Sequence, residues 1–137
     1  MAEVRAMTMD DYDQVIDLWR RTPDFRPGSF PPDVVTRYLT RNPDLSTVAV
    51  ADRQVIGTIL CGHDGRRGSL YNVTVAPEFR KQGIAKKMLE GCQNGLKAEG
   101  IRVAFRFTYA HNKDAAAFWA HEGWVAAPHI VYHDKAL

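Results

Sequence analysis

The stretch that most constrains this 137-residue chain lies at positions 73–89 and reads VTVAPEFRKQGIAKKML. It begins as a β-rich run, meets Pro77, which cannot continue a central strand, and goes on with apolar residues at helical spacing. The pattern predicts a strand over 69–75, a short turn, and a helix from Gly83 to Gly100. A strand that turns at once into an amphipathic helix favours a sheet covered by helices.

Positive charge gathers where this predicted helix begins. Arg80, Lys81 and Lys86 lie near an end at which the helix dipole is already positive, so a bound anion would compensate for them. The unpaired backbone N–H groups of a helix N-terminus suit phosphate, and Gly83 lets a phosphate approach the backbone without meeting a Cβ. The alternative is a solvated basic turn in which Gly83 only marks the start of the helix.

The remaining periodicities predict a mixed sheet with helices on its faces. Thr8 and Asp11 form a candidate capping box before a first helix, and Asn112 is a candidate cap for the last helix, which Gly123 closes. Between these two helices, segments with alternating apolar residues, typical of strands, are interrupted by one segment with helical spacing. The predicted elements are helices over 9–21, around 34–39, over 83–100 and after 112, with strands over 46–51, 54–62, 69–75, 101–109 and one or two within 124–133.

Composition limits the classes of function. The net charge of +2 is too small to favour a nucleic-acid partner, and no apolar run approaches the ~20 residues of a membrane span. Cys61 and Cys92 sit in apolar runs and are expected to be buried free thiols, and no Cys/His spacing indicates a metal. These features predict a single cytoplasmic domain over 1–137, monomeric or homodimeric, without a metal, nucleic acid or membrane partner.

The stretch at 73–89 closely resembles the acetyl-CoA-binding segment of the GCN5-related N-acetyltransferases (GNAT). Their loop pattern is Gln/Arg-x-x-Gly-x-Gly/Ala, and Arg80, Gly83 and Ala85 fill its three positions. Three further segments resemble other parts of the family, in the same order: VRAMTMDDYDQVIDLW, VIGTILCG and NKDAAAFWAHEGW. The resemblance implies an α/β (α+β) GNAT fold, with a mixed, mostly antiparallel sheet of six to seven strands and about four helices. The expected order is (β)ααβββαβαββ.

The same resemblance implies acetyl-CoA as cofactor and an amine as acceptor. Strands 69–75 and 101–109 would splay apart, and the pantetheine arm would pair with backbone around Val73 and Val75. Phe118 and Trp119 would contact this arm or serve as core packing. The cofactor-binding residues implied in this way are Val73, Thr74, Val75, Arg80, Lys81, Gln82, Gly83, Ile84, Ala85, Lys86, Asn112, Ala115, Phe118 and Trp119.

The proton donor and the general base are less evident. Many family members use a Tyr as acid where this chain has Trp119, whose indole does not donate a proton near neutral pH, and Tyr109 is a substitute candidate. Ser69 and Tyr71 occupy positions at which relatives carry Glu or His. Proton removal would then use a water held by Ser69 or Tyr71, or the turn residues His63 and Asp64. Backbone N–H groups at Val73 and Val75 would stabilise the oxyanion.

The expected function is direct acetyl transfer from acetyl-CoA to a primary amine of a small molecule or a protein. The alternative is a non-catalytic acyl-CoA-binding or regulatory module, which Trp119 and the absent carboxylate base would suit. An aromatic wall with one cation is expected to bind the acceptor. Its residues are Phe25, Arg26, Phe30, Tyr38, Tyr109 and Tyr132.

Overall fold

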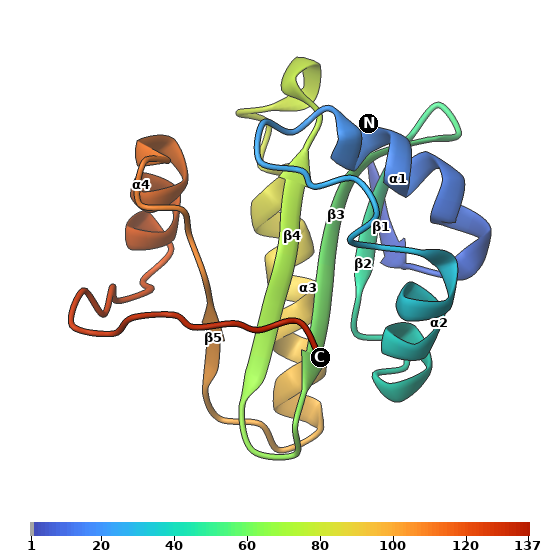
Figure 1. Cartoon of the computed structure of the whole chain (residues 1–137). Helices are drawn as coiled ribbons and strands as arrows, with labels where there is room; N and C mark the ends of the chain where they lie inside the picture. Colours follow the sequence, from blue (N-terminus) through green and yellow to red (C-terminus); the bar gives the residue numbers. More distant parts are fainter. Residues whose placement is uncertain (1) are drawn as a thin grey trace. The chain divides into compact units, whose positions relative to one another are not determined.

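The computed structural model describes residues 2–137 and divides them into two compact units, one ending at Arg106 and the other covering Phe107–Leu137. The described part of the first unit holds a five-stranded sheet whose strands lie side by side in sequence order (Figure 1). Neighbouring strands are antiparallel except for the last two, which are parallel. The strands are β1 (Glu3–Ala6), β2 (Thr47–Ala51), β3 (Gln54–His63), β4 (Gly68–Val75) and β5 (Ala104–Arg106).

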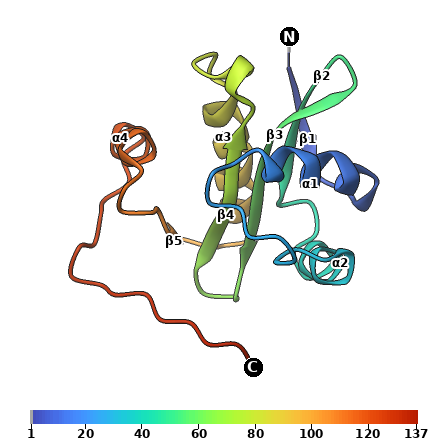
Figure 2. The same ribbon diagram turned by 45° about the horizontal axis from the view of Figure 1, so that its top comes forward.

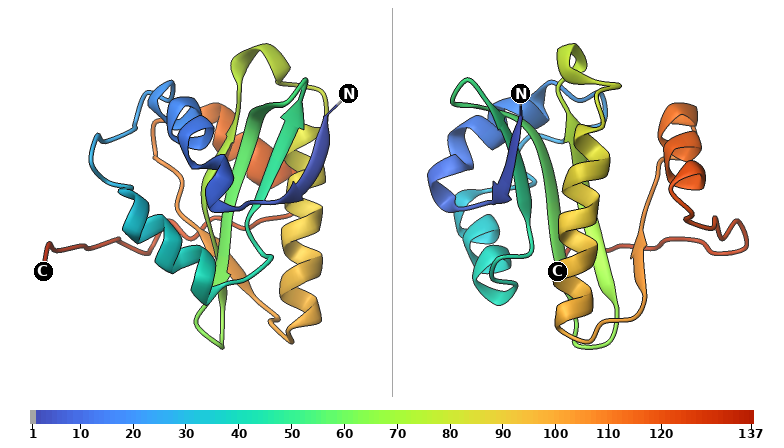
Figure 3. Two further views of the ribbon diagram at one scale, coloured as in Figure 1. Left: turned by 90° about the vertical axis from the view of Figure 1, so that its right-hand side faces the viewer. Right: turned by 180° about the vertical axis from the view of Figure 1, so that it is seen from behind.

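Helices cover both faces of this sheet. Figure 3 shows α3 (Ile84–Ala98) on one face, and α1 (Tyr12–Arg20) and α2 (Pro32–Arg41) on the other. The apolar stripe predicted for α3 is confirmed, because Met88, Leu89 and Cys92 on it are almost completely buried. Short 3₁₀ turns η1 (Met9–Asp11) and η2 (Pro77–Phe79) precede α1 and α3, and α4 (Lys113–His121) lies in the C-terminal unit. The predicted fold class is therefore confirmed.

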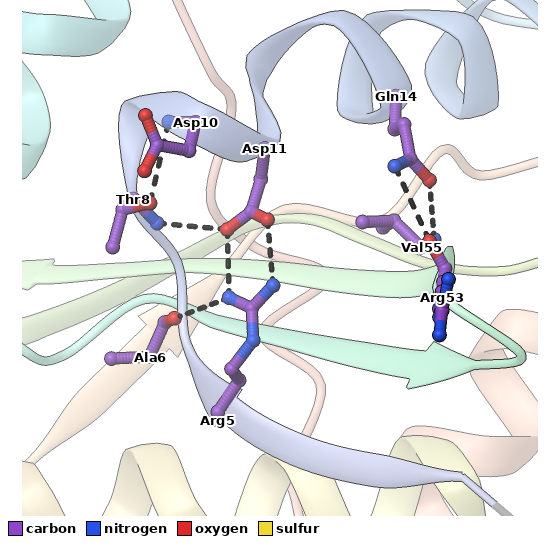
Figure 4. A network of polar contacts seen from close by, with 8 residues as sticks. All are labelled: Arg5, Ala6, Thr8, Asp10, Asp11, Gln14, Arg53 and Val55. Atoms are coloured by element: carbon purple, nitrogen blue, oxygen red, sulfur yellow. Dashed lines mark hydrogen bonds and ion pairs between the residues drawn. The ribbon is translucent and has the colours of Figure 1, made fainter.

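The capping box predicted at the start of the first helix is present (Figure 4). The Thr8 hydroxyl accepts a hydrogen bond from the Asp10 backbone N–H, and the Thr8 backbone N–H donates to Asp11 Oδ2 over 2.9 Å. Arg5 donates two further hydrogen bonds, of 2.9 and 2.8 Å, to the buried Asp11 carboxylate. These Arg5 bonds, together with the Thr8 N–H, hold the pKa of Asp11 below its usual value.

A second contact joins α1 to the sheet at the β2–β3 hairpin (Figure 4). The Val55 backbone N–H donates to Gln14 Oε1 over 2.8 Å, and Gln14 Nε2 donates to the Arg53 carbonyl over 3.4 Å. Both ends of α1 are thus tied down, since Arg21 at its C-terminal end pairs with Glu78 of η2. Helix α1 therefore has a fixed position over β3.

The sheet is smaller than the predicted six to seven strands. The alternating run 101–109 forms a strand only over Ala104–Arg106, and 124–133 forms none (Figure 2). Alternating apolar residues suit a strand, but a strand also needs the edge of a neighbouring strand with which to form hydrogen bonds. Pro128 has no N–H to donate, and Val125 remains 93% exposed, so this segment gains little from a strand conformation.

Cys61 on β3 and Cys92 on α3 are free, buried thiols, as predicted. The Cys92 thiol donates to the Leu45 carbonyl over 3.5 Å, and the Thr47 hydroxyl lies 3.7 Å from the same sulfur. Both cysteines therefore act as packing residues between the sheet and α3. Within residues 2–137, none of the helices has the length and apolar character that spanning a membrane requires.

Candidate active site

Strand β4 has an unpaired edge next to a bulge. On the side away from β3 it pairs with β5 only through Gly68–Leu70, so from Tyr71 to Val75 this edge has no strand partner among residues 2–137. On the β3 side the register shifts, because Leu60 pairs with Tyr71 and Thr58 pairs with Thr74. Two residues of β4, Asn72 and Val73, therefore oppose the single residue between Thr58 and Leu60. An unpaired edge of this kind offers backbone groups to an extended ligand.

The bulge is held by a buried chain of hydrogen bonds. Asn72 has a left-handed φ of 51°, and its carbonyl accepts a 2.8 Å hydrogen bond from the Thr58 hydroxyl. That hydroxyl in turn accepts from Trp19 Nε1 over 2.8 Å. Trp19 is 1% exposed and Thr58 is 0% exposed, so water does not compete for these bonds. Nothing in the sequence pattern singled out this chain of contacts, because Trp19 and Thr58 read as ordinary core positions.

The loop between β4 and α3 is fixed at both ends. The Ala76 N–H donates to the Ile56 carbonyl over 2.8 Å, and Arg80 Nε donates to the Val75 carbonyl over 3.1 Å. Arg21 of the α1 end makes a two-pronged ion pair with Glu78, at 3.1 and 2.7 Å, which lowers the pKa of the Glu78 carboxyl. The Glu78 side chain is exposed and paired. The loop is therefore held in place before α3 begins.

Helix α3 begins without a side-chain cap. Its N-cap is Gly83, with a φ of 78°, and Lys81 two residues earlier also has a positive φ of 61°. Apart from its chain neighbours, a Cβ built on Gly83 would meet no atom of residues 2–137 within 4 Å, so the space beside this N-cap is open. Backbone N–H groups that point into open space beside exposed Lys81 and Lys86 fit a diphosphate. The residues present are thus suited to the phosphates of coenzyme A.

Ser69 and Tyr71 lie on the sheet face that α1 and α2 cover. They pair with Gly62 and Leu60 of β3, and the Tyr71 ring meets the Tyr38 ring of α2 edge-on, with centroids 6.4 Å apart. The Tyr38 hydroxyl lies against Gly62, where a Cβ would come within 2.7 Å of it. Burial raises the pKa of Tyr38 far above its ordinary value, so this hydroxyl stays neutral.

A pocket of about 210 Å³ opens beside the bulge, between α2 and β4. Two predicted acceptor residues, Phe30 and Tyr38, line it together with Tyr71. Arg26 does not line it and is exposed on the α1–α2 loop, so the expected cation is missing from this wall. Val34 and Val35 of α2 also line it, and Val35, which is 3% exposed, belongs to the core as well. The full lining is Phe30, Val34, Val35, Tyr38, Leu60, Tyr71 and Asn72.

The alternative base candidates in the β3–β4 turn are engaged elsewhere. His63 pairs with Gly68 on the α3 face of the sheet, and its Nε2 lies 2.8 Å from Glu99 Oε1. The Asp64 carboxylate accepts the backbone N–H groups of Arg67 and Arg66, each over 2.8 Å, which lowers its pKa. A carboxylate stabilised in its charged form is a weak base. The geometry thus argues against both turn residues as the base.

The other predicted residues lie in the C-terminal unit, Phe107–Leu137. Asn112 caps α4 as predicted, because its side chain accepts a 3.0 Å hydrogen bond from the Ala115 N–H. Trp119 is buried, and its ring centroid lies 5.1 Å from that of Phe118 and 4.9 Å from that of Trp124. Tyr109 is half exposed beside His111, and Tyr132 packs on Phe107. Packing thus accounts for Trp119, and its role toward a cofactor stays a prediction.

The order of these parts, a bulged strand, a fixed loop and an open helix N-terminus, matches one known family. Residues 12–124 fit the model of the acetyltransferase (GNAT) family. The chain belongs to the GNAT family. Among curated relatives, an acetyltransferase of Photorhabdus laumondii is 43% identical over 98 residues, which are 72% of this chain and 68% of the relative.

Solved GNAT structures share the fold at low sequence identity. The aminoglycoside N-acetyltransferase AAC(6')-Iy in complex with CoA is 20% identical, with a TM-score of 0.79 over 100% of this chain and 96% of that one. The ribosomal-protein-S18-alanine N-acetyltransferase of Escherichia coli is 17% identical, with a TM-score of 0.75 over 90% and 77% of the two chains. These two proteins act on different acceptors, so the shared fold leaves the acceptor of this chain open.

Proposed function

We propose that this GNAT enzyme transfers the acetyl group of acetyl-CoA to a primary amine. The observation that carries the proposal is the unpaired, bulged edge Tyr71–Val75, followed directly by the open N-terminus of α3 at Gly83. Together they supply an edge for the pantetheine amides and N–H groups for the diphosphate. The CoA complex of AAC(6')-Iy, which shares this fold, supports acetyl-CoA as the cofactor.

The chain's own residues would hold the cofactor in two places. The backbone N–H groups from Gln82 through Ile84 and Ala85 to Lys86 would bind the diphosphate, with Arg80 and Lys81 adding charge-assisted hydrogen bonds. Val73, Thr74 and Val75 would pair with the pantetheine arm, while Arg80 keeps the Val75 carbonyl in position. Acetyl-CoA supplies an acetyl group that is already activated as a thioester. Asn112, Ala115, Phe118 and Trp119 remain proposed contacts from the C-terminal unit.

The bulge would serve the chemistry directly. A backbone N–H at Val73 or Val75 would donate to the oxyanion that forms when the amine attacks, and the Thr58 bond fixes the peptide beside it. The amine must first lose a proton, because an alkylammonium has a pKa near ~10. Tyr71 and Ser69 share the sheet face next to the bulge and would hold a water that takes this proton. Tyr109 stays the proposed donor to the leaving thiolate.

The proposal is tested by two measurements on the full chain. Calorimetric titration with acetyl-CoA measures cofactor binding, and free thiol released in the presence of a panel of primary amines measures transfer. Micromolar binding with amine-dependent thiol release supports the proposal. Binding that leaves acetyl-CoA intact with every amine would favour the acyl-CoA-binding module instead, and absence of binding would overturn both.

A further inference from the structure

The pocket beside the bulge indicates which amines this enzyme accepts. Resting on the proposed function, we infer that the acceptor carries one compact apolar group and has no second positive charge. The group would occupy the pocket between α2 and β4, and the reacting amine would lie at the bulge. Tyr71 and Asn72 belong both to the pocket lining and to the unpaired segment of β4, so the pocket adjoins the bulge.

The lining has no group that would neutralise a second ammonium. Its members are aliphatic or aromatic side chains and one amide, and none of them is Asp, Glu, Lys, Arg or His. A cation placed against such walls would lose its hydration without gaining a counter-ion. This cost does not apply to the reacting amine, which becomes neutral before it attacks. A diamine or a polycation is therefore disfavoured, whereas an alkylamine or arylalkylamine gains from burial.

The size and rigidity of the pocket restrict the apolar group. Its volume of about 210 Å³ lies below the range of roughly 300–1,000 Å³ that is usual for small-molecule sites. Its walls are fixed before any ligand binds. The Tyr12 hydroxyl donates to the Phe30 carbonyl over 2.6 Å, and Asn42 bridges the end of α2 to β3 through the Tyr38 carbonyl and the His63 N–H. The pocket therefore fits one chain or ring of the acceptor.

A matched pair of amines tests the inference. Hexylamine and 1,6-diaminohexane have the same carbon chain and differ in the second ammonium. We expect kcat/KM for hexylamine to exceed that for 1,6-diaminohexane at least tenfold. Equal values, or a preference for the diamine, would overturn the inference while leaving amine acetylation intact.

A pair of variants places this preference in the pocket. Val34 lines the pocket and is 39% exposed, so a longer polar side chain there does not disturb the core. Val34→Glu supplies the missing counter-ion and should lower the hexylamine preference at least fivefold. Val34→Gln has the same size without the charge and should keep the preference within twofold of wild type. An equal loss in both variants would contradict the electrostatic explanation.

Binding is also measured without turnover. In the presence of CoA, hexylamine should shift the methyl NMR signals of Val35 and Leu60 in the pocket, and those of Val55 at the β2–β3 hairpin should stay unchanged. If no amine is acetylated, the proposed function fails, yet shifts at Val35 and Leu60 would still support the pocket assignment. Unshifted signals at saturating amine would overturn that assignment.

Discussion

The indole Nε1 of Trp19 donates a 2.8 Å hydrogen bond to the hydroxyl of Thr58, and this hydroxyl passes the contact on to the Asn72 carbonyl at the β4 bulge. Trp19 of α1 thus fixes the backbone of β4 through the Thr58 side chain, although it makes no direct hydrogen bond to that backbone. Both side chains are shielded from water, so the three groups depend on one another. The bulge therefore has a defined conformation before any ligand arrives.

Replacing Thr58 by Val should uncouple this chain of bonds. The side chain keeps its shape, but the Trp19 N–H and the Asn72 carbonyl both lose their partner. Leaving buried groups unsatisfied costs about 1–3 kcal/mol each, so we expect a lower free energy of unfolding. We also expect kcat to fall about tenfold, because the proposed oxyanion donor would lose its position, and this fall equals about 1.4 kcal/mol in the barrier. The dissociation constant for acetyl-CoA should change less than threefold.

Thr47→Val is the matched control. Thr47 is also buried on a strand, but its hydroxyl contacts the Cys92 sulfur at 3.7 Å, away from the bulge. This variant should lose some stability and keep kcat within twofold of wild type. If both variants lose the same fraction of kcat at matched stability, the bulge is not what Thr58 positions.

Gly83 should be needed for the cofactor more than for the fold. Its φ of 78° strains any side chain, and a Cβ there would enter the open space over the α3 N-terminus. Gly83→Val should therefore weaken acetyl-CoA binding at least tenfold by calorimetry, because the diphosphate loses its close approach to the backbone.

Gly100 offers a control at the opposite end of the same helix. Its φ is 80°, and a Cβ there would meet no atom of residues 2–137 within 4 Å beyond its chain neighbours. Gly100→Val therefore carries a similar backbone strain, on the order of 1–2 kcal/mol. Acetyl-CoA affinity within twofold of wild type is expected for this variant. Comparable weakening in both variants would mean that strain in α3, and not the phosphate site, explains the effect.

Local signals made part of this site predictable. The Thr8–Asp11 capping box, the Asn112 cap and the turn from Pro77 to Gly83 each depend on residues within a few positions of one another. The bulge does not, because it arises from a register shift between two strands. The pocket likewise requires α2 to lie over the sheet, and the hydrogen bond from the His63 N–H to Asn42, which holds the end of α2 against β3, joins residues 21 positions apart.

In the C-terminal segment the sequence pattern predicted too much regular structure. Its β-rich composition predicted strands over 124–133, and the structure has none there. Strand formation depends on a partner edge with complementary hydrogen bonds, which a one-dimensional pattern does not reveal. The β-branched residues Val125, Ile130 and Val131 are typical of a strand, but they are exposed and belong to no strand pair.

Stability should depend on pH through Asp11. Its pKa is lowered in the folded chain, chiefly by the Arg5 hydrogen bonds, so its contribution is present above the unfolded pKa of about 3.9 and is lost as pH falls through the folded value. Asp11→Asn should reduce the free energy of unfolding by about 1–2 kcal/mol at pH 7, and this difference should shrink below about pH 4. Urea unfolding at pH 7 and pH 3 measures it.

Asp10→Asn is the control for this pH dependence, because the neighbouring carboxylate is exposed and the Asp10 contact to Thr8 uses the backbone N–H. This variant should change stability little at either pH. A loss for Asp11→Asn that persists unchanged at pH 3 would show that shape, rather than charge, explains the effect.

Two glycines inside α3 should respond differently to the same substitution. Alanine is favoured over glycine in a helix interior by about 0.5–1 kcal/mol. A Cβ on Gly91 would lie 3.8 Å from Thr47 Cγ2, an ordinary contact, whereas one on Gly95 would lie 2.8 Å from Leu45 Cδ2. Gly91→Ala should therefore raise the free energy of unfolding by about the full helical preference.

Gly95→Ala has to displace Leu45, which is 3% exposed in the core, so its helical gain should be cancelled or reversed. Parallel urea titrations of the two variants measure the change in the free energy of unfolding for each. Neither glycine lies at the α3 N-terminus, so acetyl-CoA affinity should stay at the wild-type value in both. Equal stabilisation by the two alanines would mean that α3 packs less tightly against Leu45, which precedes β2, than the 2.8 Å approach indicates.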